Sequence, residues 1–332
     1  MKLFRAFQQL ACGAVVLLIA LPALAQNHVD GGPTESSAPL VSTSEASRKI
    51  ISPLQAAVLG LVEGITEYLP VSSTGHLVLV DELLGLRDQT QLSAGELDAV
   101  EAYEVVIQSG AILAVILLYF KAIQQMLLGL VGRSVEGRRL LINVACAFTV
   151  TGVIGLFAHK LIKQYLQHSG PVIFALAAGG LLMLAFESSR WAKTARDHGY
   201  GLNLLTPRHA ALIGLAQCVA MWPGTSRSMM TILSGMVLGM NPVAAAEFSF
   251  ILGLPTLLAA TGLKLYKEGP MLTAHIGLPA MGIGLGVAAV AAAIAVRGFI
   301  AYLSRRGFVP FGLYRIALAV VMFLVLGFGA DL

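Results

Sequence analysis

The chain has 332 residues, of which 57% are hydrophobic and only 12% are charged, and its formal net charge is +4. Soluble domains carry roughly 25% charged residues, so this composition, together with a mean hydropathy of +0.79, excludes an ordinary soluble enzyme. The modest basic excess has no nucleic-acid signature, and the three cysteines, Cys12, Cys146 and Cys218, lack the spacing of a disulfide framework or a zinc site.

The first 50 residues differ in composition from the rest of the chain. A short basic start leads into an apolar stretch and a small-x-small triplet that ends at Ala25, which predicts a signal peptide over residues 1–25. An uncleaved first transmembrane helix is the alternative. Residues 26–50 are rich in Ser, Thr, Gly and Pro and predict a disordered polar linker. We therefore expect the membrane domain to occupy residues 51–332.

Six later stretches are apolar and approach the roughly 20-residue length that a helix needs to cross a bilayer. Their number and length predict an all-α polytopic membrane protein. They cover residues 103–120, 141–159, 172–189, 244–265, 276–296 and 311–329.

Two further apolar segments, residues 54–84 and 209–240, are interrupted, the first at Pro70 and the second at Pro223-Gly224. Proline and glycine end helices at such positions, and each half is too short to cross a bilayer. We therefore predict two re-entrant helix–loop–helix elements. Loops of this kind are tolerated at membrane depth where protein or water covers them.

The basic residues are distributed unevenly between alternate loops. If the chain enters residues 103–120 from outside, the following inside loops hold most of the Lys and Arg residues, which satisfies the positive-inside rule. This orientation predicts that both ends of the mature chain lie outside. The first re-entrant element would open outward and the second inward. The inside basic residues are Lys121, Arg133, Arg138, Arg139, Arg190, Lys193, Arg196, Arg208, Arg297, Arg305 and Arg306.

The two interrupted segments also resemble each other. Two similar halves of opposite orientation form an inverted-topology repeat, and we place these halves at about residues 51–190 and 205–330. The matched pairs are Gly60 with Gly214, Glu63 with Gln217, Pro70 with Pro223 and Ser73 with Ser226, the last two after a one-residue gap.

Glu63 and Glu67 lie four residues apart, so they share one face of a helix. Two ionised carboxylates one turn apart in an apolar setting repel and need a cation, a shared proton or a basic partner. A hard divalent cation such as Mg²⁺ or Ca²⁺ suits carboxylate oxygens, and we expect it to bind this pair. The alternative is a pair that faces solvent at a helix end.

Each interruption is followed by hydroxyl residues at the expected start of a second half-helix. Such residues cap helices, and a helix N-terminus with free N–H groups and a positive dipole end binds anions. Arg227 adds a guanidinium, which matches phosphate geometry bidentately. We expect the following residues to bind a phosphorylated substrate: Ser72, Thr74, Thr225, Ser226 and Ser228.

His76 lies three residues after Ser73, on the same helix face. A hydroxyl beside an imidazole is the arrangement of an activated nucleophile. With Glu67 and Arg227 nearby, these side chains predict phosphoryl transfer, in which Ser73 attacks or positions a water molecule and His76 manages the proton. Tyr314-Arg315, by contrast, lies near the cytoplasmic start of a span and predicts an interface anchor.

The residues collected so far resemble the undecaprenyl-pyrophosphate phosphatase family, also called bacitracin-resistance proteins. The resemblance runs from about residue 54 to the C-terminus and rests on the motifs at residues 63–76 and 223–228. It implies an enzyme of the bacterial inner membrane that hydrolyses undecaprenyl diphosphate to undecaprenyl phosphate and inorganic phosphate. This reaction recycles the lipid carrier for cell-wall synthesis and confers bacitracin resistance, because bacitracin competes for the same lipid.

The resemblance also implies roles for individual residues. The family's metal-linked acidic pair corresponds to Glu63 and Glu67, its catalytic serine and histidine to Ser73 and His76, and its phosphate-binding arginine to Arg227. A homodimer is compatible with it.

A second hypothesis is a flippase or transporter for polyprenyl phosphate lipids, because inverted repeats with discontinuous helices are a transporter design. A transporter needs no nucleophile, so the Ser73 and His76 pair favours the enzyme.

Overall fold

The structure is a computed structural model that describes residues 49–87, 92–166 and 168–327. The predicted signal peptide and nearly all of the predicted linker lie outside the described residues. The regular elements of the described part are helices. In chain order they are α2 (Pro53–Thr66), α3 (Ser73–Leu83), α4 (Ala94–Leu118), α5 (Phe120–Leu130), α6 (Val135–Tyr165), α7 (Ser169–Glu187), α8 (Arg190–His198), η2 (Leu202–Leu204), α9 (Pro207–Gln217), η3 (Cys218–Met221), α10 (Arg227–Val237), α11 (Pro242–His275), α12 (Leu278–Leu303) and α13 (Val309–Leu326).

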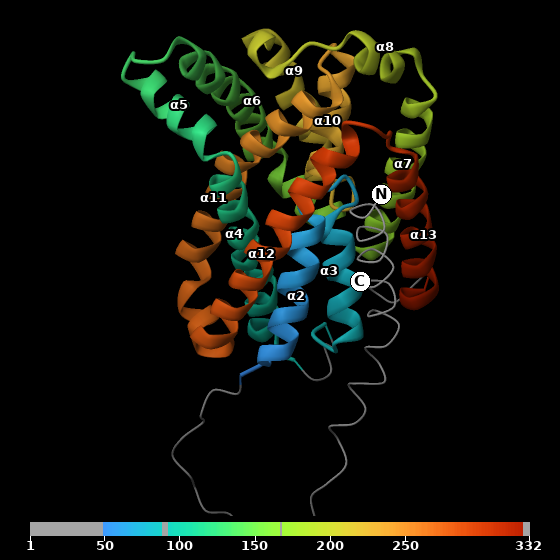
Figure 1. The fold of residues 1–332 in the computed structure, drawn as a ribbon. Coiled ribbons are helices and arrows are strands. Elements are labelled where there is room, and N and C mark those ends of the chain that lie inside the picture. Colours follow the sequence, from blue (N-terminus) through green and yellow to red (C-terminus); the bar gives the residue numbers. More distant parts are fainter. Residues whose placement is uncertain (1–48, 88–91, 167, 328–332) are drawn as a thin grey trace, which may run out of the picture.

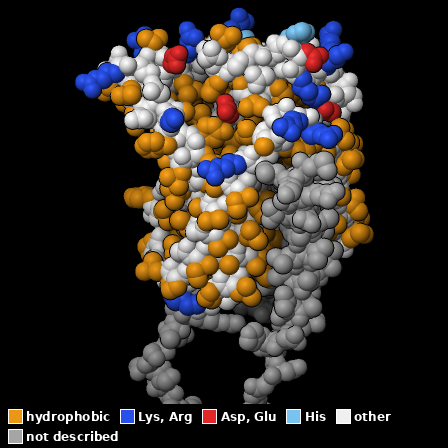
Figure 2. All heavy atoms as spheres, viewed as in Figure 1, with side chains coloured by type: hydrophobic (Ala, Val, Ile, Leu, Met, Phe, Trp, Pro, Cys, Tyr) orange, Lys and Arg blue, Asp and Glu red, His pale blue; other side chains and the backbone are white. Residues whose placement is uncertain are grey.

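Within the described residues, six helices are long and apolar enough to cross a membrane: α4, α6, α7, α11, α12 and α13. Each overlaps one predicted span, which confirms the all-α polytopic membrane fold. Helix α4 begins at Ala94 rather than at Tyr103, because Ser93 and Glu96 form a reciprocal capping box. Charged residues in these first turns lower the hydropathy from which the span was predicted. Figure 2 shows hydrophobic side chains over much of the lateral surface, with basic side chains gathered at one end.

The two interrupted segments form the helix–loop–helix elements that the sequence predicts. Helices α2 and α3 occupy one half of the molecule and α9 and α10 the other (Figure 1). The helices of these elements have between 11 and 14 residues, and at about 1.5 Å per residue none is long enough to cross a roughly 30 Å hydrocarbon core.

The first helix of each re-entrant element, α2 or α9, packs against a spanning helix of the opposite repeat half. In α2, a side chain at Gly60 would strike the backbone of Gly284 on α12. In α9, a side chain at Gly214 would strike the backbone of Ala147 on α6. Gly60 and Gly214 are matched positions of the repeat, so the same close backbone approach occurs twice. The halves are therefore interlocked, and the α4–α11 and α7–α13 contacts join them further.

The structure corrects the register of the predicted repeat at the starts of α3 and α10. Ser72 and Ser226 both adopt left-handed backbone angles, with φ of 72° and 79°. Each caps the helix that follows by accepting a hydrogen bond from a backbone N–H, that of Gly75 or of Met229. Ser226 is thus equivalent to Ser72 and not to Ser73, because the cap and not the proline fixes where each helix starts. In this ungapped register Ser73 is equivalent to Arg227.

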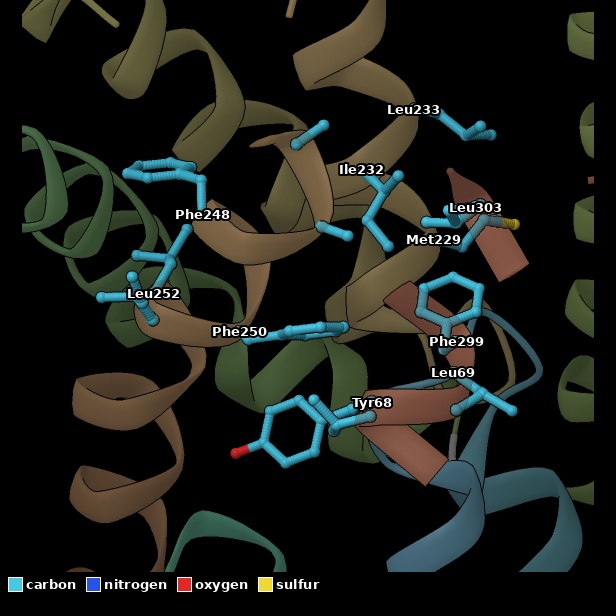
Figure 3. Packing of buried hydrophobic residues seen from close by; sticks show 14 of the residues in the cluster. Tyr68, Leu69, Met229, Ile232, Leu233, Phe248, Phe250, Leu252, Phe299 and Leu303 are labelled. Carbon is cyan, nitrogen blue, oxygen red and sulfur yellow. The ribbon is translucent and has the colours of Figure 1, made fainter. Parts of the chain in front are cut away.

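A buried aromatic cluster supports the loop that follows α2. Tyr68 meets Phe250 of α11 edge to face, with ring centroids 5.3 Å apart, and Phe250 lies 6.2 Å from Phe299 of α12 (Figure 3). Met229 and Ile232 of α10 belong to the same core. Large buried aromatic rings contribute much of a core's packing energy. The first loop is therefore held by helices of the second half.

We expect Gly60→Val to lower the thermal stability of the detergent-solubilised protein, since over-packing a close contact costs about 1–3 kcal/mol. The matched control is Gly286→Ala on α12, where an added Cβ meets nothing within 4 Å. That control should unfold at or above the wild-type temperature, because alanine favours a helix. Equal unfolding temperatures for Gly60→Val and wild type would contradict the interlocked packing.

Candidate active site

A small polar cavity of about 130 Å³ lies where the two re-entrant loops meet. It is lined by both loops and by α4 and α11. Its lining residues are Glu67, Ser72, Ser73, Thr74, Gln108, Ala220, Pro223, Gly224, Ser226, Arg227 and Leu257.

The carboxylate of Glu67 is the centre of this cavity. Ser73 donates from Oγ to Oε2 of Glu67 at 2.7 Å, and Arg227 donates from Nη2 to Oε1 at 2.8 Å. Gln108 of α4 adds a third donor, from Nε2 to Oε2 at 3.3 Å. The Glu67 side chain is only 5% exposed. One buried carboxylate therefore joins the first loop, α3, α4 and α10.

Arg227 is held in place by more than this ion pair. Its Nη1 donates to the backbone oxygen of Ser249 at 2.9 Å, and its guanidinium carbon lies 5.2 Å from the centre of the Tyr68 ring. Its Nε is buried and has no hydrogen-bond partner within the described residues. The side chain is thus fixed by three contacts, which use two of its five N–H donors.

Local sequence explains why Ser73 and Arg227 converge on Glu67. Each is the first residue of its helix, directly after the left-handed cap at Ser72 or Ser226. The first turn of a helix leaves backbone N–H groups without intrahelical partners and carries a partial positive charge. Two such helix ends face one cavity, which is suited to an anion.

His76 does not form the predicted pair with Ser73. Its Nδ1 lies 2.7 Å from the backbone oxygen of Ser72, and its Nε2 lies 2.6 Å from the hydroxyl of Tyr314. The imidazole is 3% exposed and does not line the cavity. In this structure the acceptor for the Ser73 hydroxyl is Glu67.

Glu63 lies one turn before Glu67 and is also absent from the cavity lining. It is 1% exposed, and neither of its carboxylate oxygens has a hydrogen-bond partner in the described part of the chain. A buried ionised carboxylate without a partner is strongly unfavourable. The donor set of Glu63 and Glu67 therefore fits a cation. The described residues contain no group of three or more His, Cys, Asp or Glu side chains placed to hold a metal ion.

The predicted hydroxyl residues divide into two groups. Ser72, Thr74 and Ser226 line the cavity, as a phosphate-binding role requires, whereas Thr225 and Ser228 do not. Ser228 is fully buried and donates to the backbone oxygen of Leu69 at 2.8 Å, so it ties α10 to the first loop.

Sequence reasoning gave no site role to three residues that the structure places at or next to the cavity. Gln108 is polar within an apolar span, one turn after Glu104, and this is the signal for it in the sequence. The interpretation of Tyr314-Arg315 as an interface anchor was wrong, because Arg315 is fully buried and Tyr314 contacts His76. The signal for this pair in the sequence was an arginine inside an apolar span. The partners of Arg315 could not be predicted, because they lie in loops far away in the sequence.

Comparison with known proteins identifies the family of this chain. The family described as "Bacitracin resistance protein BacA" matches residues 56–321, which include every predicted site residue. The chain belongs to this family. Proteins named undecaprenyl-diphosphatase are similar over most of their length. That of Sorangium cellulosum is 43% identical over 80% of this chain and 84% of its own. The Methylococcus capsulatus protein is 44% identical over 81% of this chain and 93% of its own.

Proposed function

We propose that this chain hydrolyses undecaprenyl diphosphate to undecaprenyl phosphate and inorganic phosphate. The observation that carries this proposal is the Glu67 carboxylate, which accepts hydrogen bonds from both Ser73 and Arg227 beside two helix N-termini. A nucleophile, its base and an anion-binding arginine are the parts that phosphoryl transfer requires. The curated relatives, which carry the name undecaprenyl-diphosphatase, support the choice of substrate.

The contacts of Glu67 support an order of events. Ser73 Oγ attacks the terminal phosphorus while its proton passes to Oε2 of Glu67, 2.7 Å away. The bond between that phosphorus and the bridging oxygen breaks, and the leaving undecaprenyl phosphate takes the electron pair and the proton from Glu67. Water then attacks the phosphoserine and gives its proton to Glu67. The bond to Oγ breaks, Ser73 regains a proton from Glu67, and phosphate leaves.

Arg227 and the two helix ends stabilise the charge that develops on the phosphoryl oxygens. Arg227 keeps N–H donors for this, because its contacts with Glu67 and the Ser249 backbone use two of its five N–H groups. Glu63 and Glu67 would hold Mg²⁺ or Ca²⁺, and the cation when bound neutralises further phosphoryl charge. A cation at Glu63 would also explain why its buried oxygens lack protein partners.

Phosphate release from undecaprenyl diphosphate by the purified protein tests this proposal. Ser73→Ala and Arg227→Lys should each lower kcat by about 100-fold or more, since loss of a nucleophile or of a transition-state donor costs on that order. Ser304→Ala and Arg133→Ala, two exposed positions, are the matched controls. EDTA should abolish the activity and added Mg²⁺ or Ca²⁺ restore it. Full activity in Ser73→Ala or in EDTA would contradict the assigned roles.

We also propose that the chain lies in the bacterial inner membrane with both described ends outside. Lys49 donates to the backbone oxygens of Thr273 and Ala274, so the start of the domain and the end of α11 share one face. The opposite end carries the exposed basic residues of the α5–α6 turn and of α8. A positive inside face puts the α2–α3 element on the outer side.

Single cysteines in a cysteine-free background test this orientation. Thr273→Cys, exposed at the end of α11, should react with an impermeant thiol reagent in intact cells. Arg133→Cys, exposed in the α5–α6 turn, should react only after permeabilisation. The reverse labelling pattern would invert the proposed topology.

A further inference from the structure

Arg315 is a fully buried arginine whose partners are backbone carbonyl groups. Its Nη2 donates to the oxygens of Gly224 at 2.8 Å and Ala175 at 3.1 Å, and its Nη1 reaches the oxygen of Pro70 at 3.4 Å. Pro70 and Gly224 belong to the two different re-entrant loops. Among the described residues, no carboxylate forms a salt bridge with Arg315. One guanidinium therefore joins both loops from behind the cavity.

Small residues create the space that this arginine needs. A side chain at Gly179 of α7 would strike the Arg315 guanidinium. Gly180 and Gly312 let α7 and α13 approach closely, since a side chain at either would meet the backbone oxygen of the other within 3 Å. The contact between α7 and α13 therefore admits a long charged side chain to the centre of the molecule.

Tyr314, the residue before Arg315, contacts the first loop through His76. Its hydroxyl lies 2.6 Å from Nε2 of His76, and the two rings stack with an interplanar angle of 11°. The Ser72 carbonyl can only accept, so Nδ1 of His76 carries the hydrogen of that bond. In the neutral imidazole Nε2 then accepts from Tyr314. The chain of bonds runs from Tyr314 through His76 to the strained residue Ser72.

These bonds hold one peptide in each of the two re-entrant loops. In a planar trans peptide the carbonyl and the following N–H point in opposite directions, and the described residues contain no cis peptide bond. Holding the Ser72 carbonyl toward His76 directs the N–H of Ser73 the other way. In the second loop Arg315 holds the Gly224 carbonyl, and the N–H of the same peptide, that of Thr225, donates to the backbone oxygen of Trp222 at 3.1 Å, so this peptide is fixed at both ends.

We propose that Tyr314 and Arg315 are positioning residues for phosphoryl transfer, and that His76 is the link through which Tyr314 acts. Neither Tyr314 nor Arg315 lines the cavity, so they set the orientation of Ser73 and of the helix N-terminal amides through the loop backbone. This inference rests on the proposed hydrolysis. It differs from the predicted proton-handling role of His76, because both ring nitrogens are committed to hydrogen bonds with Ser72 and Tyr314.

Steady-state kinetics of Tyr314→Phe, which removes one hydroxyl, test the inference. We expect kcat to fall on the order of tenfold or more with KM within about threefold, since misplaced reacting groups slow the chemical step. The matched control is Tyr103→Phe, whose hydroxyl donates to backbone oxygens away from both re-entrant loops and outside the cavity lining. Arg315→Lys should show the same loss in kcat. Thermal unfolding establishes that each variant is folded.

A double-mutant cycle separates positioning from other roles. In a His76→Leu background, Tyr314→Phe should cause no further loss, because its action requires the imidazole. An undiminished second loss would overturn the link through His76. A raised KM with unchanged kcat, or reduced stability alone, would overturn the positioning role. The proposed hydrolysis has its own test, because it would be contradicted if the wild-type protein released no phosphate.

Discussion

The largely buried ion pair between Glu67 and Arg227 is the interaction on which the rest of the site depends. It joins a residue at the end of α2 to the first residue of α10, which belong to opposite halves of the chain. Breaking a buried pair by removing one partner costs about 3–5 kcal/mol, because the remaining charge is left uncompensated. The same carboxylate accepts the Ser73 hydrogen bond. The carboxylate that joins the halves is thus also the proposed base for the proposed nucleophile Ser73.

The corrected register explains why Ser73 and Arg227 both contact Glu67. Ser73 and Arg227 are equivalent residues of an inverted repeat, each placed directly after a left-handed serine cap. The first half kept a hydroxyl and the acidic pair, whereas the second half has Gln217 where the first has Glu63. Two similar helix ends therefore contribute different chemistry. In the proposed mechanism one supplies the attacking group, and the other supplies charge for the phosphoryl oxygens.

Much of this could be predicted from the sequence alone. Hydropathy locates the spans, and the interruptions at Pro70 and Pro223-Gly224 locate the re-entrant loops. Polar residues in an apolar setting single out Glu67, Ser73 and Arg227, because such residues are costly unless they are used.

The rest depends on tertiary contacts that no local pattern contains. The i,i+3 spacing of Ser73 and His76 predicted a pair, yet His76 is held by Tyr314, which lies 238 residues further along the chain. The cap at Ser72 depends on a backbone angle, and the sequence match followed the prolines instead. Arg315 was interpreted as an anchor because its carbonyl partners are invisible in sequence.

The most direct test of the account is to look for phosphate on Ser73 during the first turnover. The protein is mixed with excess undecaprenyl diphosphate, quenched with acid after milliseconds to seconds, and digested for mass spectrometry. The account predicts a phosphoserine at Ser73 that forms and decays as fast as phosphate is released. Phosphate release without phosphoserine at Ser73, or with a phosphorylated residue elsewhere, would contradict it.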